Sequence, residues 1–412
     1  MEYHVHPLRN GIRLLHVPAV SSIAHACILI PAGSRDESER QWGIAHFIEH
    51  LIFKRTEKRN TQQILNRLES VGADLNAYTT KEYTCIHASF LQPYLDRTLE
   101  LFQDIVFHST FPLSEMEKEK AVILDEMASY LDQPEEAIAD DFEDMLFKEH
   151  ALGRNILGSP ESLTAITPAD IRDFLQQNYR TDQIIVAVLG QYPLKKVQYI
   201  AERYFDAIPE NSPARQRCAP VGYVPEQRQV EKPIMQAHTM LGMPAYSLHH
   251  PYKTGLLLLN NLLGGSGMSA ILNMQIREKH GIAYTIESNY SPLTDTGIFA
   301  VYFGTDKEKT ERTLRLVEKE FKKIREQRMS VLQLHKAQNR FIGQIALGEE
   351  NRIGLLIGMA KSLLDYQQID DLETVFKKIR AVTAEEILSL ANTVLDEKQR
   401  SVLSFIPAKT AE

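Results

Sequence analysis

The plan of the first half of the chain returns in the second half, and this repetition limits the available folds more than any single motif. Residues 166–190 read ITPADIRDFLQQNYRTDQIIVAVLG, a threonine cap followed by an amphipathic helix and an apolar strand. VTAEEILSLANTVLDEKQRSVLSFI has the same order, and Thr383 follows Thr167 by 216 residues. The segments DRTLELFQDI (from Asp96) and ERTLRLVEKE (from Glu311) correspond at nearly this offset. We therefore expect an internal duplication that gives two similar domains.

A proline-rich segment separates the two copies. Five prolines lie between Pro209 and Pro233, where the chain reads PENSPARQRCAPVGYVPEQRQVEKP. Proline interrupts helices and sheet ladders, so this segment is typical of a linker. A chain of 412 residues also exceeds the length that one modest core needs. We predict a first domain over residues 1–208, a linker over 209–233 and a second domain over 234–412.

Each domain is expected to combine strands and helices. GIRLLHV, AHACILIPAG and TCIHASFL have the character of strands, whereas residues 40–54 and 61–71 have helical periodicity. The strands and helices do not alternate strictly, which argues against a parallel βαβ sheet. The predicted fold class is α+β, with two similar domains of mixed, largely antiparallel sheet packed with helices.

The composition excludes several classes of partner and compartment. A net charge of −8 argues against a nucleic-acid-binding surface, which needs clustered Lys and Arg. The most apolar stretch, TGLLLLNNLLGG, is too short to span a bilayer, so no membrane partner is expected. Three scattered cysteines suit a reducing compartment, and the N-terminal MEYHVHPLRNGIRLL lacks the pattern of a signal peptide. These features predict a cytoplasmic protein.

The segment HFIEH, within GIAHFIEHLIFK, is the strongest chemical signal in the sequence. On a helix, His46 and His50 are four residues apart and share a face, with Glu49 beside them. Two imidazoles in this arrangement can bind one zinc ion, and a neighbouring carboxylate can act as a general base. The spacing is the inverse of the H-E-x-x-H motif of metallopeptidases. A helical histidine pair of this kind is also common on ordinary surfaces and in cores.

A catalytic zinc site needs a third protein ligand, which must come from elsewhere. In SEMEKEKAVILDEMASY, Glu119 and Glu126 are seven residues apart and share one helix face. The alternative is a solvated face on which Lys118 and Lys120 pair with these carboxylates. Spacing alone does not choose between the two interpretations.

Taken together, the motifs AGSRDE, GIAHFIEHLIFK, LNAYTTKEYT and EKEKAVILDEM resemble the pitrilysin family of inverted-zincin metallopeptidases. The resemblance covers nearly the whole chain and is strongest to short bacterial relatives of the mitochondrial processing peptidase. It implies that His46, His50 and Glu126 bind one zinc ion per chain. It also implies that Glu49 is the general base and that Glu119 orients a ligand histidine from outside the coordination shell.

The resemblance assigns further residues to substrate binding. Asn76 and Ala77, in LNAYTTKEYT, match positions that contact the backbone of a substrate added as a β-strand. Arg277 and Tyr284, in REKHGIAY, match a pair that stabilises the oxyanion at the scissile carbonyl. Without the resemblance, we would interpret these four residues as a strand entry, a surface arginine and a packed tyrosine.

In this family two such two-domain units enclose a chamber, and the Arg and Tyr come from the unit opposite the zinc. The resemblance therefore implies a homodimer, or a pair with a homologous subunit. It implies a zinc-dependent endopeptidase that hydrolyses peptides or small unfolded polypeptides inside the closed chamber. The alternative is a non-catalytic structural or assembly subunit. A nucleotide site built on GGSG (264–267) has little support because no G-K-[ST] follows.

Two positions depart from the family pattern. Arg55 stands in FKRT where the family usually has glycine, and Ala73 stands where it often has a second glycine. Neither position is a predicted metal ligand, so the departures bear on substrate preference.

Overall fold

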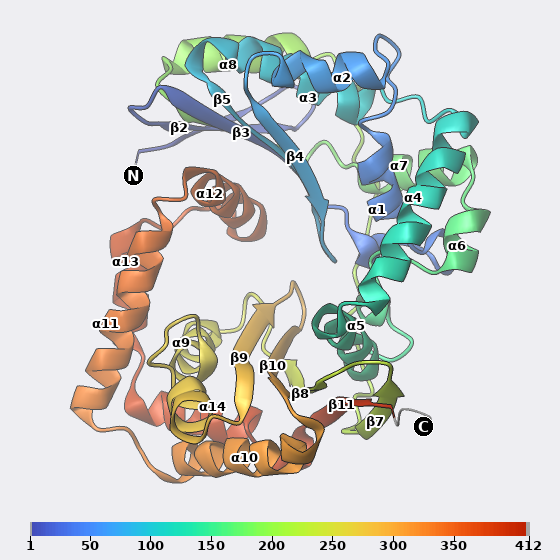
Figure 1. Cartoon of the computed structure of the whole chain (residues 1–412). Helices are drawn as coiled ribbons and strands as arrows, with labels where there is room; N and C mark the ends of the chain where they lie inside the picture. Colours follow the sequence, from blue (N-terminus) through green and yellow to red (C-terminus); the bar gives the residue numbers. More distant parts are fainter. Residues whose placement is uncertain (1, 409–412) are drawn as a thin grey trace. The chain divides into compact units, whose positions relative to one another are not determined.

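The computed structural model describes residues 2–408, and these form two compact units (Figure 1). Unit 1 contains residues 2–127, 154–217 and 348–371, and unit 2 contains residues 128–153, 218–347 and 372–408. Each unit is built around one β-sheet with helices packed on it. The predicted α+β class, with two similar domains, is confirmed.

The sheet of unit 1 has six strands in the order β1-β2-β6-β3-β5-β4. All neighbours are antiparallel except β2 and β6, which are parallel. The strands are β1 (His4–Pro7), β2 (Arg13–Pro18), β3 (Ile23–Ile30), β4 (Asp74–Thr79), β5 (Thr84–Leu91) and β6 (Ile185–Gly190). Every residue of β6 is buried, because β6 lies in the middle of the sheet and both its faces are covered.

The sheet of unit 2 repeats this connectivity with five strands in the order β7-β11-β8-β10-β9. The strands are β7 (Gln227–Lys232), β8 (Ala237–Ala245), β9 (Ala283–Pro292), β10 (Gly297–Thr305) and β11 (Ser401–Pro407). Here β7 and β11 are parallel neighbours, as β2 and β6 are in unit 1, and all other pairs are antiparallel. The shared order of strands supports the duplication that the repeated segments predicted.

Each unit also contains several helices. In unit 1 the helices are α1 (Ile44–Leu51), α2 (Thr61–Glu69), α3 (Leu95–Phe107), α4 (Leu113–Leu131, which extends past the unit boundary), α6 (Pro160–Ala165), α7 (Pro168–Asn178) and α8 (Leu194–Phe205). In unit 2 they are α9 (Lys253–Gly264), α10 (Thr310–Glu326), α11 (Val331–Gly348, which ends just past the unit boundary), α13 (Leu372–Ala381) and α14 (Ala384–Val394). The predicted threonine caps are present: Thr167 caps α7 and Thr383 caps α14.

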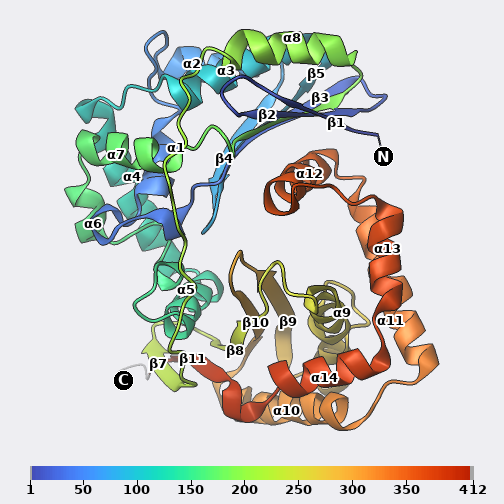
Figure 2. The same ribbon diagram turned by 180° about the vertical axis from the view of Figure 1, so that it is seen from behind.

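Two helices cross between the sequence halves. Helix α5 (Pro134–Leu146) comes from the first half but packs on β8 and β11 of unit 2 (Figure 2). Helix α12 (Arg352–Tyr366) comes from the second half but packs on β3 and β6 of unit 1. Each copy of the repeat therefore supplies a covering helix to the other unit. The predicted boundaries 1–208 and 234–412 do not anticipate this exchange.

The segment predicted as a linker is only partly irregular. Residues 209–226 contain no helix or strand, but Gln227–Lys232 forms β7 at the edge of the second sheet. Before it leaves unit 1, the segment is anchored by Arg217, which donates hydrogen bonds to both carboxylate oxygens of Asp36 at 2.9 and 2.7 Å.

Among the described residues, no helix is both long and apolar enough to cross a membrane.

The exchanged helix α12 gives a direct test of this architecture. Leu356 of α12 is fully buried against the first sheet, so Leu356→Ala should destabilise unit 1 by about 2–5 kcal/mol. Trp42, the single tryptophan of the chain, lies in unit 1 and reports its unfolding by fluorescence. Leu347→Ala, at a position 75% exposed, is the control and should leave the transition nearly unchanged. Equal midpoints for the two variants would contradict the packing described.

Candidate metal centre and active site

Helix α1 places the histidines of HFIEH on the face opposite the core. Ile44, Phe47, Ile48 and Leu51 are buried in the core of unit 1, as the apolar positions of an amphipathic helix should be. The remaining face carries the polar side chains of the motif toward β4 and the long helix α4. The helix is shorter than the predicted 40–54, because residues 39–41 form a separate 3₁₀ turn and Gly43 has a φ of 92°.

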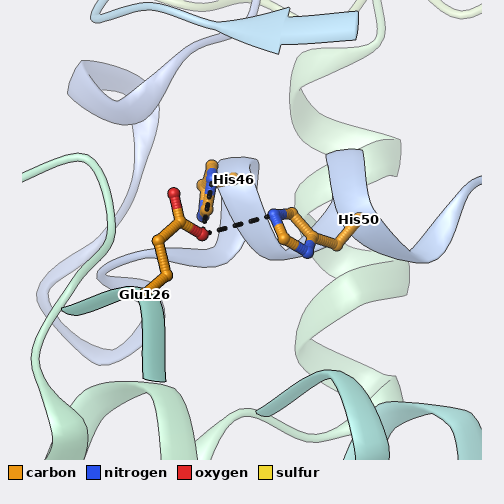
Figure 3. Close-up of side chains that lie close together, drawn as sticks. All are labelled: His46, His50 and Glu126. Atoms are coloured by element: carbon orange, nitrogen blue, oxygen red, sulfur yellow. Dashed lines mark ion pairs between the residues drawn. The ribbon is translucent and has the colours of Figure 1, made fainter. Parts of the chain in front are cut away.

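His46, His50 and Glu126 form a compact cluster of possible metal ligands (Figure 3). Their nearest donor atoms all lie within 4.8 Å of one another. Nε2 of His50 is 3.6 Å from Oε2 of Glu126, and Nε2 of His46 is 3.9 Å from the same oxygen. Donor atoms around a tetrahedral zinc ion are separated by roughly 3.3 Å, given bonds of about 2 Å. The cluster therefore needs only small side-chain movements to hold one ion.

The hydrogen bonds of the cluster suit metal binding. Nδ1 of His50 is 3.2 Å from Oε2 of Glu119, so the tautomer with a proton on Nδ1 donates to Glu119 and leaves the Nε2 lone pair facing Glu126. Burial, with the nearby His50 ring, lowers the pKa of His46 to about 3. His46 is therefore neutral at physiological pH, which is the form that binds a metal. The donor set of two imidazoles and one carboxylate fits zinc.

Glu49 lies beside this cluster as a half-buried carboxyl group. Burial raises its pKa above the usual glutamate value, and hydrogen bonds from the side chain and backbone of Thr79 partly oppose that rise. Its second oxygen, Oε2, is buried and has no hydrogen-bond partner among the described residues. An ionisable group with a raised pKa and an open acceptor oxygen is typical of a general base.

Lys54 completes the surroundings of Glu119. Its Nζ is 2.7 Å from Oε1 of Glu119, so this nearly buried carboxylate bridges Lys54 and His50. The solvated-face alternative for α4 is not what the structure shows: Lys118 pairs with Glu115, and Lys120 pairs with Glu117. Glu119 and Glu126 instead point toward α1, where both meet His50.

Strand β4 forms one wall of the site. It is the edge strand of the first sheet, and it carries Asn76 and Ala77. Both residues line a cavity of about 290 Å³ together with Glu49, His50 and Glu119. The apolar side chains of Phe53, Leu65 and Leu75 line the same cavity. Five of the predicted residues thus meet at one concave surface, where an extended peptide can pair with the free edge of β4.

Arg277 and Tyr284 lie in unit 2. Arg277 belongs to a π-helical turn, Asn273–Glu278, and Nη1 donates to Oδ1 of Asn273 at 3.5 Å. Tyr284, at the start of β9, is 55% exposed and donates its hydroxyl to Oδ1 of Asp306 at 2.9 Å. This hydrogen bond raises the pKa of the Tyr284 hydroxyl. Both side chains offer the hydrogen-bond donors that an oxyanion site requires.

The sequence interpretation missed Lys54, Thr79 and Glu37. Lys54 follows His50 by four residues, so helical spacing alone gave a signal for it. Thr79 bonds Glu49 across a gap of thirty residues that the sequence does not close. Glu37 is close to α1 in sequence, but its partners are backbone N–H groups, which leave no side-chain pattern.

A duplicated α+β chain with a His-His-Glu cluster beside a half-buried glutamate is the arrangement expected of a metallopeptidase. Two family models match consecutive parts of the chain: Insulinase (Peptidase family M16) over residues 16–160 and Peptidase M16 inactive domain over residues 165–341. The chain belongs to peptidase family M16. The family resemblance inferred from the motifs is confirmed.

Relatives cover almost the whole chain. The uncharacterized zinc protease YmxG of Bacillus subtilis is 28% identical over 391 residues, which cover 94% of this chain and 95% of the relative. The uncharacterized zinc protease SCO5738 of Streptomyces coelicolor is 30% identical and covers 95% of this chain and 87% of its own length. A solved peptidase M16 inactive domain from Pseudomonas fluorescens superposes with a TM-score of 0.89 at 21% identity, and the match covers all of both chains. The structure of a protease from Helicobacter pylori superposes with a TM-score of 0.87 at 20% identity, and the match covers 98% of this chain and 99% of that one. These two structures support the fold.

Proposed function

We propose that this protein is a zinc-dependent endopeptidase that hydrolyses peptides or small unfolded polypeptides. The observation that carries the proposal is the cluster of His46, His50 and Glu126 with the half-buried Glu49 beside it. The relatives named zinc proteases support the class of activity. We propose one zinc ion per chain, held by these two histidines and Glu126.

Zinc at this cluster supplies Lewis acidity that makes water more acidic and polarises a carbonyl group. The protein supplies the proton transfers. Glu49 accepts the proton of the attacking water and later delivers it to the leaving amine. Its raised pKa makes the carboxylate a stronger base for the first step, and a pKa nearer the working pH lets one group act first as base and then as acid. Glu119, held by Lys54, keeps His50 oriented.

The remaining assignments concern the substrate. We propose that the peptide adds to the edge of β4, where Asn76 and Ala77 contact its backbone. Arg277 and Tyr284 would bind the scissile carbonyl, and Tyr284 must first release Asp306 to do so. We further propose a homodimer in which these two residues act on the site of the other copy. A cytoplasmic location stays a prediction.

The central test replaces Glu49 by glutamine. This change keeps the size of the side chain but removes the base, so peptide hydrolysis should fall at least 100-fold while zinc content stays at about one ion per chain. Hydrolysis of a mixture of unfolded peptides and bound metal should be measured on the same samples. Glu117→Gln is the matched control, because this side chain is 66% exposed on α4 and faces away from the cluster.

The outcomes separate the possible functions. Loss of hydrolysis only in the Glu49 variant supports the endopeptidase. Zinc binding without hydrolysis by the wild type would favour the non-catalytic subunit instead. Absence of zinc from the wild type would contradict the metal site itself.

Action between two copies has its own test. Glu49→Gln and Arg277→Ala chains should each be inactive alone, because each lacks one part of the proposed machinery. If Arg277 serves the site of the other copy, mixed dimers contain one intact site, and about a quarter of wild-type activity should return on statistical mixing. Activity is measured before and after the chains exchange. No recovery in verified mixed dimers would contradict action in trans.

A further inference from the structure

We propose that Glu37 is a positioning residue of the metal centre: its carboxyl group fixes the first turn of α1, and with it the two histidines, in the geometry that binds zinc. The inference rests on the zinc role proposed above. Glu37 touches neither the cluster nor the substrate cavity, so its effect must pass through the backbone of α1.

The contacts of Glu37 are those of a helix cap supplied from outside the helix. Oε2 accepts the N–H of Gly43 at 2.8 Å, and Oε1 accepts the N–H of Ala45 at 2.9 Å. The first N–H groups of a helix have no partner within it, and side chains usually satisfy them. Gly43, at the cap position of α1, has no side chain for this purpose. Glu37 takes that place, because its two oxygens accept both N–H groups.

Glu37 lies in the interior, where these two contacts satisfy its carboxyl oxygens. The residue is only 6% exposed. Burial raises the pKa of Glu37 to about 8, although the two N–H groups and the charges of Lys81 and Arg154 oppose the rise. Burying a carboxyl group costs free energy unless it is hydrogen-bonded. A buried glutamate with no structural role would therefore destabilise the fold.

The start of α1 needs this support because the helix is short. It has eight residues, and isolated helices of that length are only marginally stable. His46 directly follows Ala45, so a shift of the first turn moves this ligand equally. Metal–ligand distances tolerate deviations of only about 0.2 Å. Loosening the first turn should therefore weaken zinc binding even where the rest of the fold is intact.

The opposite side of the helix start is also fixed. A Cβ at Gly43 would lie 2.6 Å from the carbonyl oxygen of Leu157, and one at Gly158 would lie 2.7 Å from that of Trp42. The turns at Gly43 and Gly158 thus pack backbone against backbone. The Trp42 ring also donates a hydrogen bond to the carbonyl of Asn155 at 2.7 Å. Glu37 and the turn at Gly158 therefore hold the first turn of α1 from two sides.

The segment that carries Glu37 is itself attached to the substrate side of the site. The 3₁₀ turn η1 (Ser34–Asp36) precedes Glu37, and its Ser34 N–H donates to the carbonyl of Thr80 at 3.1 Å. Thr80 follows Thr79, which bonds Glu49. Glu37 therefore places α1 relative to the end of β4 as well as to the core. A positioning role explains why a carboxyl group is placed here.

The experiment compares zinc affinity with stability in the full-length protein. Glu37→Ala removes both acceptors and Glu37→Gln keeps one, so zinc affinity should fall about 10-fold or more in the first and less in the second. Asp104→Ala is the control, because Asp104 is fully buried and bonds Arg59 and Thr56 away from α1. Zinc affinity is measured by chelator competition and the unfolding temperature on zinc-free protein. Cobalt substitution adds a spectrum that reports ligand geometry.

The expected result is that both alanine variants unfold at lower temperature, whereas only the Glu37 variants lose zinc affinity and change the cobalt spectrum. If Glu37→Ala does not fold, the glutamine variant provides the same comparison. Wild-type zinc affinity and an unchanged spectrum in the Glu37 variants would overturn the positioning role and leave the endopeptidase proposal intact. A wild type that binds no zinc would overturn both.

Discussion

The candidate site depends on the contact between helices α1 and α4, where His50 of α1 lies against Glu119 and Glu126 of α4. His46, Glu119 and one oxygen of Glu49 are all withdrawn from water there. Burying such polar groups costs free energy unless they form hydrogen bonds or ion pairs. Glu119 meets this requirement by pairing with Lys54 and His50 together. Once α1 and α4 are fixed, the positions of the three possible metal ligands and of Glu49 are fixed as well.

The rest of unit 1 holds α1 in place for this contact. The core of unit 1 orients α1 by burying its apolar face, and α12 covers the other face of the same sheet. Because α12 comes from the second half of the chain, unit 1 cannot be completed by residues 1–217 alone. The duplication therefore produced two units that depend on each other for a covering helix. Only the first unit carries the His-His-Glu cluster among the described residues.

Much of this could be predicted from local patterns. Repeated caps and strands indicated the duplication, and helical spacing placed His46 with His50 and Glu119 with Glu126. Residue spacing could not show that α4 crosses α1, so the third ligand depended on family resemblance. The exchange of α5 and α12 was missed because an amphipathic helix does not specify which of two similar sheets it covers. Glu37 was missed for a related reason: its partners are backbone N–H groups, which leave no trace in the side-chain pattern.

The most direct measurement is a zinc titration of metal-free protein with peptide hydrolysis as the readout. The metal is first removed with a chelator, and zinc is then restored in small steps. We expect no hydrolysis by the metal-free protein, and activity that rises in proportion to added zinc until about one ion per chain is bound. Full hydrolysis by the metal-free protein would contradict the account, because a site built from His46, His50 and Glu126 would then have no part in the reaction.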